Sequence, residues 1–503
     1  MARQDEIVRE RLKKLKELRD AGINPYPYSY DAKNNSKELR EKYLHLKNNE
    51  KKADKVKIAG RIMAIRELGK ITFASVQDEF GRIQAILQED ETPEKCRNFF
   101  KKYLDGGDFA GFEGTILRTQ RGELSVVVKK CELLSKSILP LPDKWHGLED
   151  KEERYRKRYL DLIINSQVKE VFLKREKIID AIREFLKEKG FVEIETPYLQ
   201  TIYGGAEARP FKTHLNALDI DLFLAISPEL YLKRLIVGGF SKVFTIARNF
   251  RNEGIDRWHN PEFSMMEIYQ AYADYNDMMD LFESIYEYAC KKVLGKTKIE
   301  YGSDVLEFKK PWKRITMAES IKQHAKIDVL TMSELELRDF AEENKIEPKG
   351  NSWGWLVAGI FEHFCEKKII QPTFIIDHPR ETTPLCKGHR KDTRLIERFE
   401  PFCMGAELGN AYSELNDPIV QKKLLEEQAE MLKKGNEGAN PYDEDFVNAI
   451  EVGMPPTGGL GLGIDRMIIL LTQQLSIRDI IAFPFMRPLQ AEKENKEENA
   501  NKQ

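Results

Sequence analysis

The segment from Phe244 to Tyr272, FTIARNFRNEGIDRWHNPEFSMMEIYQAY, constrains the fold of this chain more than any other. It begins as a strand of alternating apolar residues, passes through a polar loop and returns as a second strand. Such a hairpin would direct charged side chains to one face, where a purely structural sheet has apolar or indifferent positions. The polar and aromatic residues that it presents are Arg251, Glu253, His259, Phe263, Glu267 and Tyr269.

Two later segments also carry polar residues that stand out from their surroundings. FEPFCMGAELGNAYSELND, residues 399–417, is otherwise largely uncharged and contains Glu400, Glu407, Asn410 and Glu414. GGLGLGIDR, residues 458–466, is rich in glycine and ends in Arg466 before the apolar helix MIILLT. The glycine pattern alone indicates little, because alternate glycines beside a helix can simply permit close packing.

The length of the chain requires more than one domain. Its 503 residues exceed the roughly 250 to 300 at which a single core stops growing. We predict an N-terminal helical extension over residues 1–55, because residues 5–21 form an amphipathic pattern that ends near Gly22. Residues 56–136 consist of short β-rich pieces separated by glycines. They predict a small closed β-barrel such as an OB-fold, with a β-sandwich as the alternative.

The remainder of the chain mixes strands and helices. Residues 137–160 are predicted to be a linker, because SILPLPDKWHG has two prolines and no periodicity. Residues 161–488 form the large domain, which opens with an apolar helical stripe closed by Gly190 and continues into a strand, FVEIETP. Residues 489–503 contain almost no apolar side chains and are predicted to be disordered. The fold class is therefore α+β with several domains.

Composition excludes some classes of protein. With 41% hydrophobic and 33% charged residues and a net charge of −2, the chain is a globular protein whose net charge says nothing about nucleic acid. No apolar run approaches the roughly 20 residues of a membrane span, and the start MARQDEIVRE lacks the apolar core of a signal peptide. The six cysteines are scattered, as expected in a reducing compartment. We therefore expect a cytoplasmic protein without membrane contact.

The order and spacing of these segments resemble the class II aminoacyl-tRNA synthetases, and specifically their lysine enzymes. The helix and strand ending at Pro197 look like motif 1, FRNE with HNPEF looks like motif 2, and GLGLGIDR looks like motif 3. GGAEARPF, PELYLKRL and NAYSELND are similar to the lysine enzymes in particular. The resemblance implies a catalytic domain built on an antiparallel sheet flanked by helices, and a homodimer joined through motif 1. It also implies a lysine–tRNA ligase reaction, in which ATP and L-lysine form lysyl-adenylate and lysine then passes to tRNA(Lys).

Activation of lysine brings two anions together, the lysine carboxylate and the α-phosphate, so a positioned cation is required. The resemblance gives this catalytic role to Arg251, with Arg466 as its second cation, and places adenine between Phe263 and Arg466. Mg²⁺ prefers carboxylate oxygens, and Glu400 and Glu407 match the metal-binding pair of the family. The complete predicted ATP-binding set is Arg251, Glu253, His259, Asn260, Phe263, Glu400, Glu407, Gly463 and Arg466.

The charges of three glutamates predict the amino-acid subsite. Glu229, Glu267 and Glu414 would repel one another in an empty, dry pocket unless cations fill it, and lysine brings two ammonium groups. The resemblance assigns Glu414 and Tyr269 to the ε-ammonium, and leaves open whether Glu229 or Glu267 holds the α-ammonium. The complete predicted lysine-binding set is Gly205, Glu229, Glu267, Tyr269, Asn410, Tyr412 and Glu414.

The barrel segment GKITFASVQDEFGRIQ, residues 69–84, resembles the anticodon-binding stretch of the same subfamily. Phe73 would stack on an anticodon base, whereas its period alone favours a barrel core position. The predicted anticodon-binding residues are Arg66, Phe73, Gln84 and Glu123.

Three alternatives remain. An aspartyl- or asparaginyl-tRNA synthetase shares the barrel and the three motifs, but it would need a cation to receive an acidic side chain. A paralogue that lysylates a protein would lack residues 56–134, and a non-enzymatic RNA-binding relative would have no reason to keep Arg251 with Arg466.

In the motif 2 loop, Trp258 stands where some relatives have a phosphate-contacting arginine, with Arg257 one position earlier. Which of the two meets the outer phosphates is open.

Overall fold

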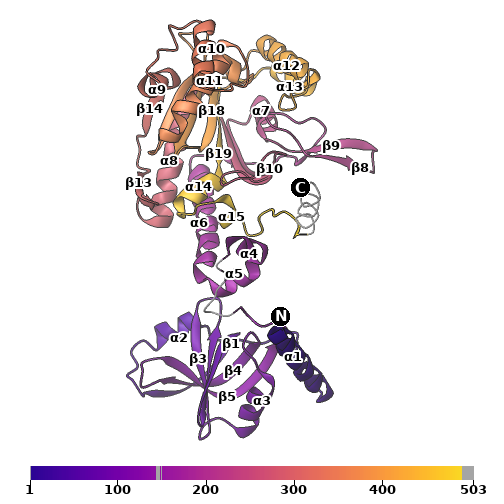
Figure 1. Cartoon of the computed structure of the whole chain (residues 1–503), viewed down its shortest axis with the longest axis vertical. Helices are drawn as coiled ribbons and strands as arrows, with labels where there is room; N and C mark the ends of the chain where they lie inside the picture. The colour runs from indigo at the N-terminus through magenta and orange to yellow at the C-terminus, as the bar shows by residue number, and fades with distance from the viewer. Residues whose placement is uncertain (1, 143–147, 149, 490–503) are drawn as a thin grey trace, which may run out of the picture. The chain divides into compact units, whose positions relative to one another are not determined.

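The computed structural model describes residues 2–142, 148 and 150–489 and divides into two units, residues 1–149 and 150–503 (Figure 1). From residue 490 onward, the tail predicted to be disordered lies outside the described residues. The same is true of residues 143–147 and 149 within the predicted linker.

Five strands of the N-terminal unit close into a barrel with the order β1-β2-β3-β5-β4. The β3–β5 pair is parallel and the other pairs are antiparallel. The strands are β1 (Lys51–Leu68), β2 (Ile71–Gln77), β3 (Arg82–Gln88), β4 (Phe109–Arg118) and β5 (Leu124–Ser135), and α3 (Glu94–Tyr103) lies between β3 and β4. The closed barrel predicted from the glycine-separated strand pattern is therefore confirmed.

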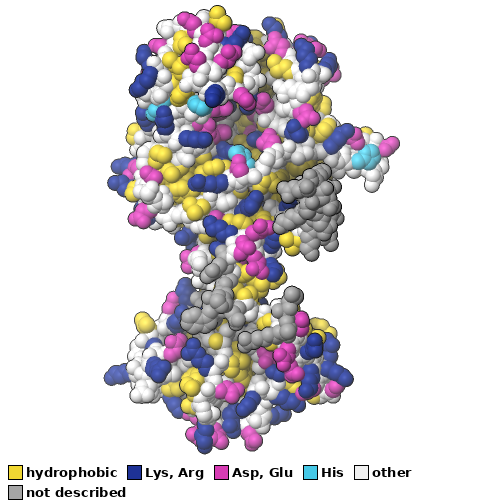
Figure 2. Space-filling view, viewed as in Figure 1, with side chains coloured by type: hydrophobic (Ala, Val, Ile, Leu, Met, Phe, Trp, Pro, Cys, Tyr) yellow, Lys and Arg dark blue, Asp and Glu magenta, His cyan; other side chains and the backbone are white. Residues whose placement is uncertain are grey.

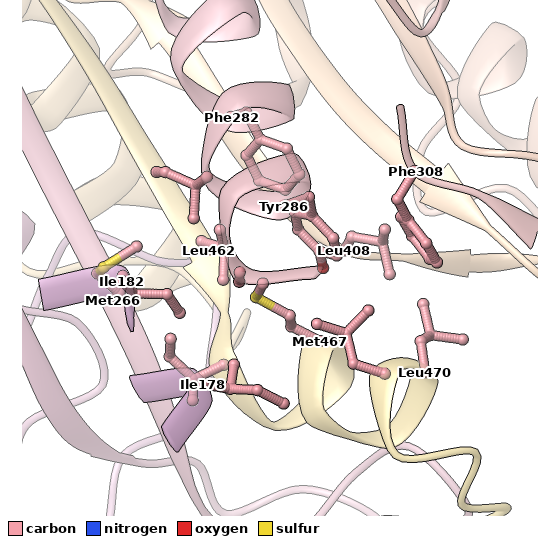
Figure 3. Packing of buried hydrophobic residues seen from close by; sticks show 14 of the residues in the cluster. Ile178, Ile182, Met266, Phe282, Tyr286, Phe308, Leu408, Leu462, Met467 and Leu470 are labelled. Carbon is pink, nitrogen blue, oxygen red and sulfur yellow. The ribbon is translucent and has the colours of Figure 1, made fainter. Parts of the chain in front are cut away.

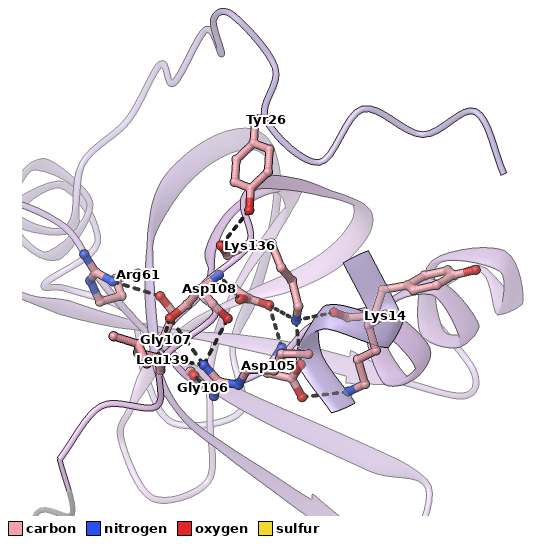
Figure 4. Close-up of polar contacts among 12 residues, drawn as sticks. Lys14, Tyr26, Arg61, Asp105, Gly106, Gly107, Asp108, Lys136 and Leu139 are labelled. Carbon is pink, nitrogen blue, oxygen red and sulfur yellow. Dashed lines mark hydrogen bonds and ion pairs between the residues drawn. The ribbon is translucent and has the colours of Figure 1, made fainter. Parts of the chain in front are cut away.

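The N-terminal extension packs onto this barrel. It contains α1 (Ala2–Asp20) and α2 (Ser36–Lys42), whose residues Leu18 and Leu39 belong to the barrel's hydrophobic core. Figure 4 shows the polar part of the contact, in which the buried ammonium of Lys136 reaches Asp105 and Asp108 while Lys14 of α1 contacts Asp105. A buried ammonium with two carboxylates is satisfied, so these ion pairs anchor α1 rather than strain the core.

The C-terminal unit is built on a nine-stranded sheet of order β14-β15-β16-β18-β19-β11-β10-β6, with β17 added beside β16. The β14–β15 and β10–β6 pairs are parallel and the others antiparallel, which confirms the predicted sheet type. Its strands are β6 (Val192–Glu193), β10 (Lys242–Phe250), β11 (Glu262–Ala271), β14 (Lys313–Thr316), β15 (Thr373–Pro379), β16 (Leu395–Cys403), β17 (Ala406–Glu407), β18 (Gly409–Ser413) and β19 (Thr457–Gly463).

Helices and two small sheets surround this sheet (Figure 1). The small sheets are β7 (Leu199–Gln200) with β9 (Ile220–Leu224) and β8 (Lys212–Leu215), and β12 (Lys298–Tyr301) with β13 (Asp304–Glu307). The helices are α4 (Lys151–Arg156), α5 (Arg158–Ile164), α6 (Ser166–Glu188), α7 (Glu229–Val237), α8 (Tyr275–Ala289), α9 (Met317–His324), α10 (Glu334–Glu343), α11 (Trp353–Phe364), α12 (Pro418–Lys433), α13 (Glu444–Val452), α14 (Ile464–Leu471) and α15 (Ile477–Ile480). No helix of the described residues is long and apolar enough to cross a membrane.

Two boundaries differ from the sequence expectations. The second half of the predicted linker forms α4 and the start of α5, because Arg158 is buried and donates to Asp161 and to the carbonyl oxygen of Arg478. The strand predicted over residues 191–197 is shorter in the structure, where β6 is followed by one more hydrogen bond from the Ile194 N–H to the Phe244 carbonyl. The preceding helix α6 ends at Glu188, and Gly190, whose φ of 80° suits glycine, lies just past its C-cap residue Lys189.

The hydrophobic core covers one face of the large sheet. Figure 3 shows side chains from α6, α8 and α14 packed against alternate residues of β11 and β19, among them Met266 and Leu462. Each fully buried side chain of this size contributes about 1.5 to 3 kcal/mol. Because successive strand residues point to opposite faces, Glu267 and Tyr269 of β11 are directed away from this core. The opposite face is therefore where a polar site can form.

Candidate functional site

A cavity of about 460 Å³ opens on the face of the large sheet opposite the hydrophobic core. Its floor consists of β11, β16, β18 and β19, and α11 contributes to its wall. Figure 2 shows its mouth as a hollow in the C-terminal unit, with acidic side chains visible inside. The predicted hairpin is present in the structure, where β10 and β11 pair in register from Lys242–Gln270 to Phe250–Glu262.

The cavity brings together the predicted residues of both subsites. All nine residues predicted for ATP line it, and so do all those predicted for lysine except Glu414. Glu414 lies directly behind Gly459, where a Cβ atom would collide with Glu414 Oε1 and with the Tyr269 ring. Only glycine at this position lets the carboxylate approach the floor. Buried Glu414 Oε1 has no hydrogen-bond partner among the described residues, so it is an acceptor that still requires a donor.

One end of the cavity is acidic and tightly hydrogen-bonded. Ser227 Oγ donates to Glu267 Oε1 at 2.8 Å and the Tyr269 hydroxyl donates to Glu267 Oε2 at 3.0 Å. The ammonium of Lys233, a residue that the sequence argument missed, lies 2.6 Å from Glu229 Oε1 and 2.5 Å from Glu414 Oε2. Three carboxyl groups and one ammonium therefore lie close together, and their side chains are almost inaccessible to solvent.

Burial dominates the electrostatics of this end. It raises the pKa of Glu267 to about 8, and the charge of Glu229 adds to the rise. Burial also raises the pKa of Glu414 to about 8, against the opposing effect of Lys233. The pKa of Tyr269 lies well above its usual value, first because of burial and then because of the surrounding carboxylates. Such shifts are typical of sites that need a charged ligand to be complete.

Gly205 lines this end of the cavity, next to Ser227 and Glu229. Its φ of 84° is one that side-chain-bearing residues rarely adopt, and a Cβ atom here would lie 2.9 Å from both Glu229 Cβ and Ser227 Oγ. A glycine is therefore required where the loop passes over Glu229. The position predicted from GGAEARPF has a structural reason as well as a binding role.

The other end of the cavity carries the arginines. The Arg251 guanidinium lies 5.1 Å from the centre of the Phe263 ring, and burial lowers its pKa while Glu253 opposes the change. Arg466 Nη2 lies 3.0 Å from His259 Nε2, and Nη1 lies 3.4 Å from Glu407 Oε2. The Asn260 amide donates to the Glu262 carbonyl at 2.7 Å. In this structure Phe263 therefore faces Arg251, and the predicted partner Arg466 contacts the loop histidine.

Glu400 and Glu407 line the cavity on β16 and β17. Burial raises the pKa of Glu407, and the charge of Glu400 adds to the rise. Burial also raises the pKa of Glu366 to about 7, with Glu362 and Glu400 as the next causes. Carboxylate oxygens are the ligands that a hard divalent cation prefers, although the described residues contain no group of three or more His, Cys, Asp or Glu side chains placed to hold a metal ion. Glu362 and Glu366 were not predicted, because they come from the α11 region, outside the motifs.

A second missed residue holds the predicted Asn410 in place. Arg398 Nε donates to Asn410 Oδ1 at 2.9 Å, and Asn410 Nδ2 donates to the Tyr412 hydroxyl at 2.6 Å. Arg398 also contacts Glu400. The signal was available: Arg398, Glu400 and Phe402 alternate on one strand, and all three line the cavity.

The motif 2 loop separates its two candidate residues. Trp258 lines the cavity and packs against the core, whereas Arg257 is absent from the lining. The Arg257 guanidinium donates to the Tyr301 hydroxyl at 3.2 Å and lies 4.9 Å from the Trp258 ring centre. Arg257 thus faces away from the cavity in this structure.

In the barrel, three of the predicted anticodon residues share its outer face. Phe73 pairs with Arg66 on β1 and with Ile86 on β3, and Gln84 lies opposite Ser75. This register directs the side chains of Arg66, Phe73 and Gln84 to the outside of the barrel. Phe73 is partly exposed while its neighbours Ala74 and Val76 are buried, so it is not the core residue that its period suggested. Glu123 is exposed just before β5.

Comparison with known proteins matches both units. The family described as "tRNA synthetases class II (D, K and N)" matches residues 150–487, and the "OB-fold nucleic acid binding domain" matches residues 56–134. A lysine–tRNA ligase of Methanoculleus marisnigri is 49% identical over 479 residues, covering 95% of this chain and 94% of its own. The lysine–tRNA ligase of Pelotomaculum thermopropionicum is 50% identical, with coverages of 96% and 95%. That of Thermotoga maritima is 47% identical, with coverages of 98% and 98%.

Proposed function

Because this chain belongs to the lysine–tRNA ligases of the class II tRNA synthetase family, we propose that its cavity is where L-lysine reacts with ATP. The enzyme is an ATP-dependent aminoacyl-tRNA synthetase. It converts lysine to lysyl-adenylate with release of pyrophosphate, and then transfers lysine to the 3′ end of tRNA(Lys) with release of AMP. The observation that carries the placement is a single cavity with an acidic end and an arginine-rich end.

Arg251 is the residue that we assign to the reacting groups. A lysine carboxylate oxygen attacks the α-phosphorus, the bond from that phosphorus to the bridging oxygen breaks, and pyrophosphate leaves. Negative charge accumulates on the α-phosphate as the two anions approach. A planar guanidinium in a partly buried site can bridge both groups, and its charge counts for more there than in water. The position of Arg251 between Phe263 and the acidic end supports this assignment.

The nucleotide would occupy the arginine-rich end. Phe263 offers its ring to adenine, and Arg466, held at the cavity by His259 and Glu407, offers a second guanidinium. The remaining residues proposed to contact ATP are Glu253, His259, Asn260 and Gly463, which all line the cavity. No covalent intermediate on the enzyme is required.

Glu400 and Glu407 are proposed to hold Mg²⁺. The raised pKa of Glu407 and the nearby surplus of carboxylates fit a divalent cation. Bound between these carboxylates, the ion would neutralise negative charge on the phosphates. Arg398, which contacts Glu400, would keep that carboxylate turned toward the cavity.

Lysine would occupy the acidic end. We assign the ε-ammonium to Glu414 and Tyr269, and the α-ammonium to Glu229, Glu267 and the Gly205 carbonyl. The unpartnered Glu414 Oε1 supports the first assignment, because a buried acceptor without a donor is costly unless a ligand supplies one. Asn410, oriented by Arg398, would receive the carboxylate, and Tyr412 would line the aliphatic stem.

The acidic end also argues against aspartate or asparagine as the substrate. Either would need a free cation or donor for its side chain. The cation that faces this end, Lys233, already contacts two carboxylates, Glu229 and Glu414. The side-chain carboxylate of an incoming aspartate would meet three buried carboxyl groups in place of a cation, which is strongly unfavourable.

The barrel is proposed to bind the anticodon of tRNA(Lys) through Arg66, Phe73, Gln84 and Glu123. Their common outer face supports this, because single-stranded bases stack on exposed aromatic side chains beside polar groups that read their edges. We further propose that the enzyme acts in the cytoplasm, where tRNA is charged for translation.

We propose a homodimer formed through α6 and the neighbouring edge strand β6. Val192, Tyr198 and Leu199 are each about half exposed beside β6, which is the terminal strand of the large sheet. Exposed apolar side chains at an open sheet edge favour association with a second copy. Sedimentation should give twice the mass of the chain, and an active monomer would overturn this part of the proposal.

Lysine-dependent exchange between ATP and radiolabelled pyrophosphate tests the function. We expect exchange with lysine and none with aspartate or asparagine. Arg251→Ala should abolish it while the melting temperature stays close to wild type. Exchange driven by aspartate, or normal exchange in Arg251→Ala, would contradict the assignment.

A further inference from the structure

Lys233 is a fully buried cation that the proposed reaction does not use. It lies on α7, and its side chain has no solvent-exposed surface. Its ammonium contacts Glu229 one turn earlier on the same helix and Glu414 beyond β18. Its Nζ also lies 6.0 Å from the centre of the Phe446 ring of α13. Lys233 does not line the cavity, whereas Glu229 does.

The net charge of this cluster matches the two ammonium groups of lysine. Glu229, Glu267 and Glu414 carry three negative charges when ionised, and Lys233 supplies one positive charge. Two negative charges remain, which equals the number of ammonium groups on lysine. Without Lys233 the same pocket would hold three uncompensated carboxylates, and buried carboxylates so close together take up protons instead of staying ionised.

Lys233 also divides the oxygens of Glu414. Oε2 contacts the Lys233 ammonium, while Oε1 lies beside Gly459 and Tyr269 at the cavity floor without a hydrogen-bond partner among the described residues. An ammonium that holds one oxygen fixes the rotation of the carboxylate. The second oxygen is thereby directed toward Gly459 and Tyr269, which line the cavity.

We propose that Lys233 is the positioning residue that sets lysine specificity, by acting as a resident counter-ion that orients Glu229 and Glu414 and favours the ionised forms that the substrate's two ammonium groups require. This inference rests on the proposed function and deepens it. Lys233 touches neither substrate nor reacting atoms. It acts through the two carboxylates, and it leaves a net charge that only a doubly cationic ligand neutralises.

Several other groups face this cluster and enter its titration. They are Glu267 and Tyr269 on β11, Tyr412 on β18, Arg398 on β16, Arg251 after β10 and Cys386 beside Glu414. Lys233, unlike these groups, has its ammonium in direct contact with Glu414, and its charge lowers the pKa of that carboxyl against the effect of burial. Removing it should therefore move the titration of the subsite toward higher pH.

The test compares the full-length enzyme with Lys233→Met in pyrophosphate exchange between pH 6 and 9. We expect the lysine KM at pH 7 to rise at least about 30-fold, because a buried carboxylate loses its partner. The ATP KM should stay within about twofold, and the pH at which kcat/KM for lysine is half-maximal should rise by at least about one unit. Arg234→Met is the matched control, because Arg234 is the next residue on α7 but pairs with Asp443 away from the cavity. It should leave the pH profile unchanged.

Two further variants keep the inference falsifiable. Lys233→Ala should recover lysine activation with millimolar methylammonium but not with methanol, which is similar in size and uncharged. Should Lys233→Met fail to fold, Lys233→Met with Glu414→Gln loses one charge of each sign and should fold while still binding lysine poorly. Failure of that double variant to fold would overturn the charge argument.

An unchanged lysine KM and pH profile in Lys233→Met would overturn the inference while leaving the lysine activity of the wild type intact. Equal rises in the KM values of lysine and ATP, without rescue by methylammonium, would reduce Lys233 to a structural residue. Absence of lysine-dependent exchange in the wild-type enzyme would instead refute the proposed function.

Discussion

Arg466 Nη2 lies 3.0 Å from His259 Nε2, although the two residues are 207 positions apart in the chain. The same guanidinium contacts Glu407 through its other terminal nitrogen. Arg466 therefore links the hairpin loop, the helix α14 that follows β19 and the carboxylate pair. A cation with protein partners on both sides is held at the cavity before the nucleotide arrives, so little ordering remains to be done on binding.

Arg466→Ala should therefore weaken ATP use much more than lysine binding. We expect kcat/KM for ATP to fall by a factor of about 100 or more, since a preorganised charge at a phosphate or base is lost. Steady-state exchange with ATP and lysine varied separately measures both effects. Arg257→Ala is the matched loop control: its side chain is directed to Tyr301, so a change of less than about threefold is expected. Equal losses in the two variants would mean that both arginines meet the phosphates.

Glu407→Gln should raise the Mg²⁺ concentration needed for half-maximal exchange more than it raises the lysine KM. The substitution removes one of two carboxylates that repel each other, so the site loses the charge that attracts a divalent cation. Titrating Mg²⁺ at saturating lysine and ATP provides the measurement. If only lysine binding suffers, the metal assignment is wrong.

The contrast between Arg466 and Lys233 shows what the sequence could reveal. Arg466 ends a glycine-rich strand, and the resemblance gave it a role that the cavity accommodates. Lys233 stands four residues after Glu229 on a helix, a spacing that usually marks an exposed ion pair. Only the fold brings the distant Glu414 beside them and buries all three. A local pattern cannot distinguish an exposed pair from a buried triad.

Strand periodicity was the more informative pattern. It placed Glu267 and Tyr269 on one face because alternate residues of β11 point the same way. For Phe73 the period favoured the barrel core, whereas Phe73 is partly exposed and its neighbours Ala74 and Val76 are buried. The extension was harder to interpret, since Leu18 is buried among barrel residues that lie far along the chain. Contacts between distant segments are not encoded in any local period.

Lysine binding should release protons between pH 6 and 8. Burial raises the pKa of both Glu267 and Glu414 to about 8, so the lysine-free pocket holds their neutral forms at pH 7. Both values exceed that of a glutamate in an unfolded chain, so this contribution to stability is lost as the pH rises from about 4.5 to 8. Ammonium groups require the ionised forms. Lysine affinity should thus rise by up to about tenfold per pH unit for each proton released, and level off above pH 8.

Calorimetric titration of lysine at pH 7 in buffers with different heats of ionisation checks this directly. A dependence of the observed heat on the buffer gives the number of protons released. Identical heats in phosphate and Tris would show that both carboxyls are already ionised in the free enzyme.

Phe73→Ala should impair charging of tRNA while sparing the activation of lysine. Loss of one stacked base costs about 1 to 3 kcal/mol, which would appear in kcat/KM for tRNA(Lys). Pyrophosphate exchange, which needs no tRNA, should be unchanged. Phe80→Ala is a suitable control, because Phe80 is an exposed aromatic residue at the turn between β2 and β3. Equal loss in charging and exchange would mean that Phe73 is merely structural.

Glu414→Gln tests the assignment of lysine as the amino-acid substrate, because that assignment depends most on this one residue. Glu414 is 1% exposed, and its free oxygen is the acceptor that we assign to the ε-ammonium. Neutralising a buried carboxylate leaves the ammonium that it holds unpaired, at a typical cost of about 3 to 5 kcal/mol. We expect kcat/KM for lysine to fall by a factor of at least about 100.

The substitution nearly preserves shape, so the arginine-rich end should be unaffected and the ATP affinity should stay close to wild type. The resident cation complicates the result in an informative way, because Lys233 would also lose one of its two partners. Adding Lys233→Met should not restore binding, because the carboxylate that we assign to the ε-ammonium is still missing. Normal activation of lysine by Glu414→Gln would refute the ε-ammonium assignment, although the enzyme would still be a class II synthetase.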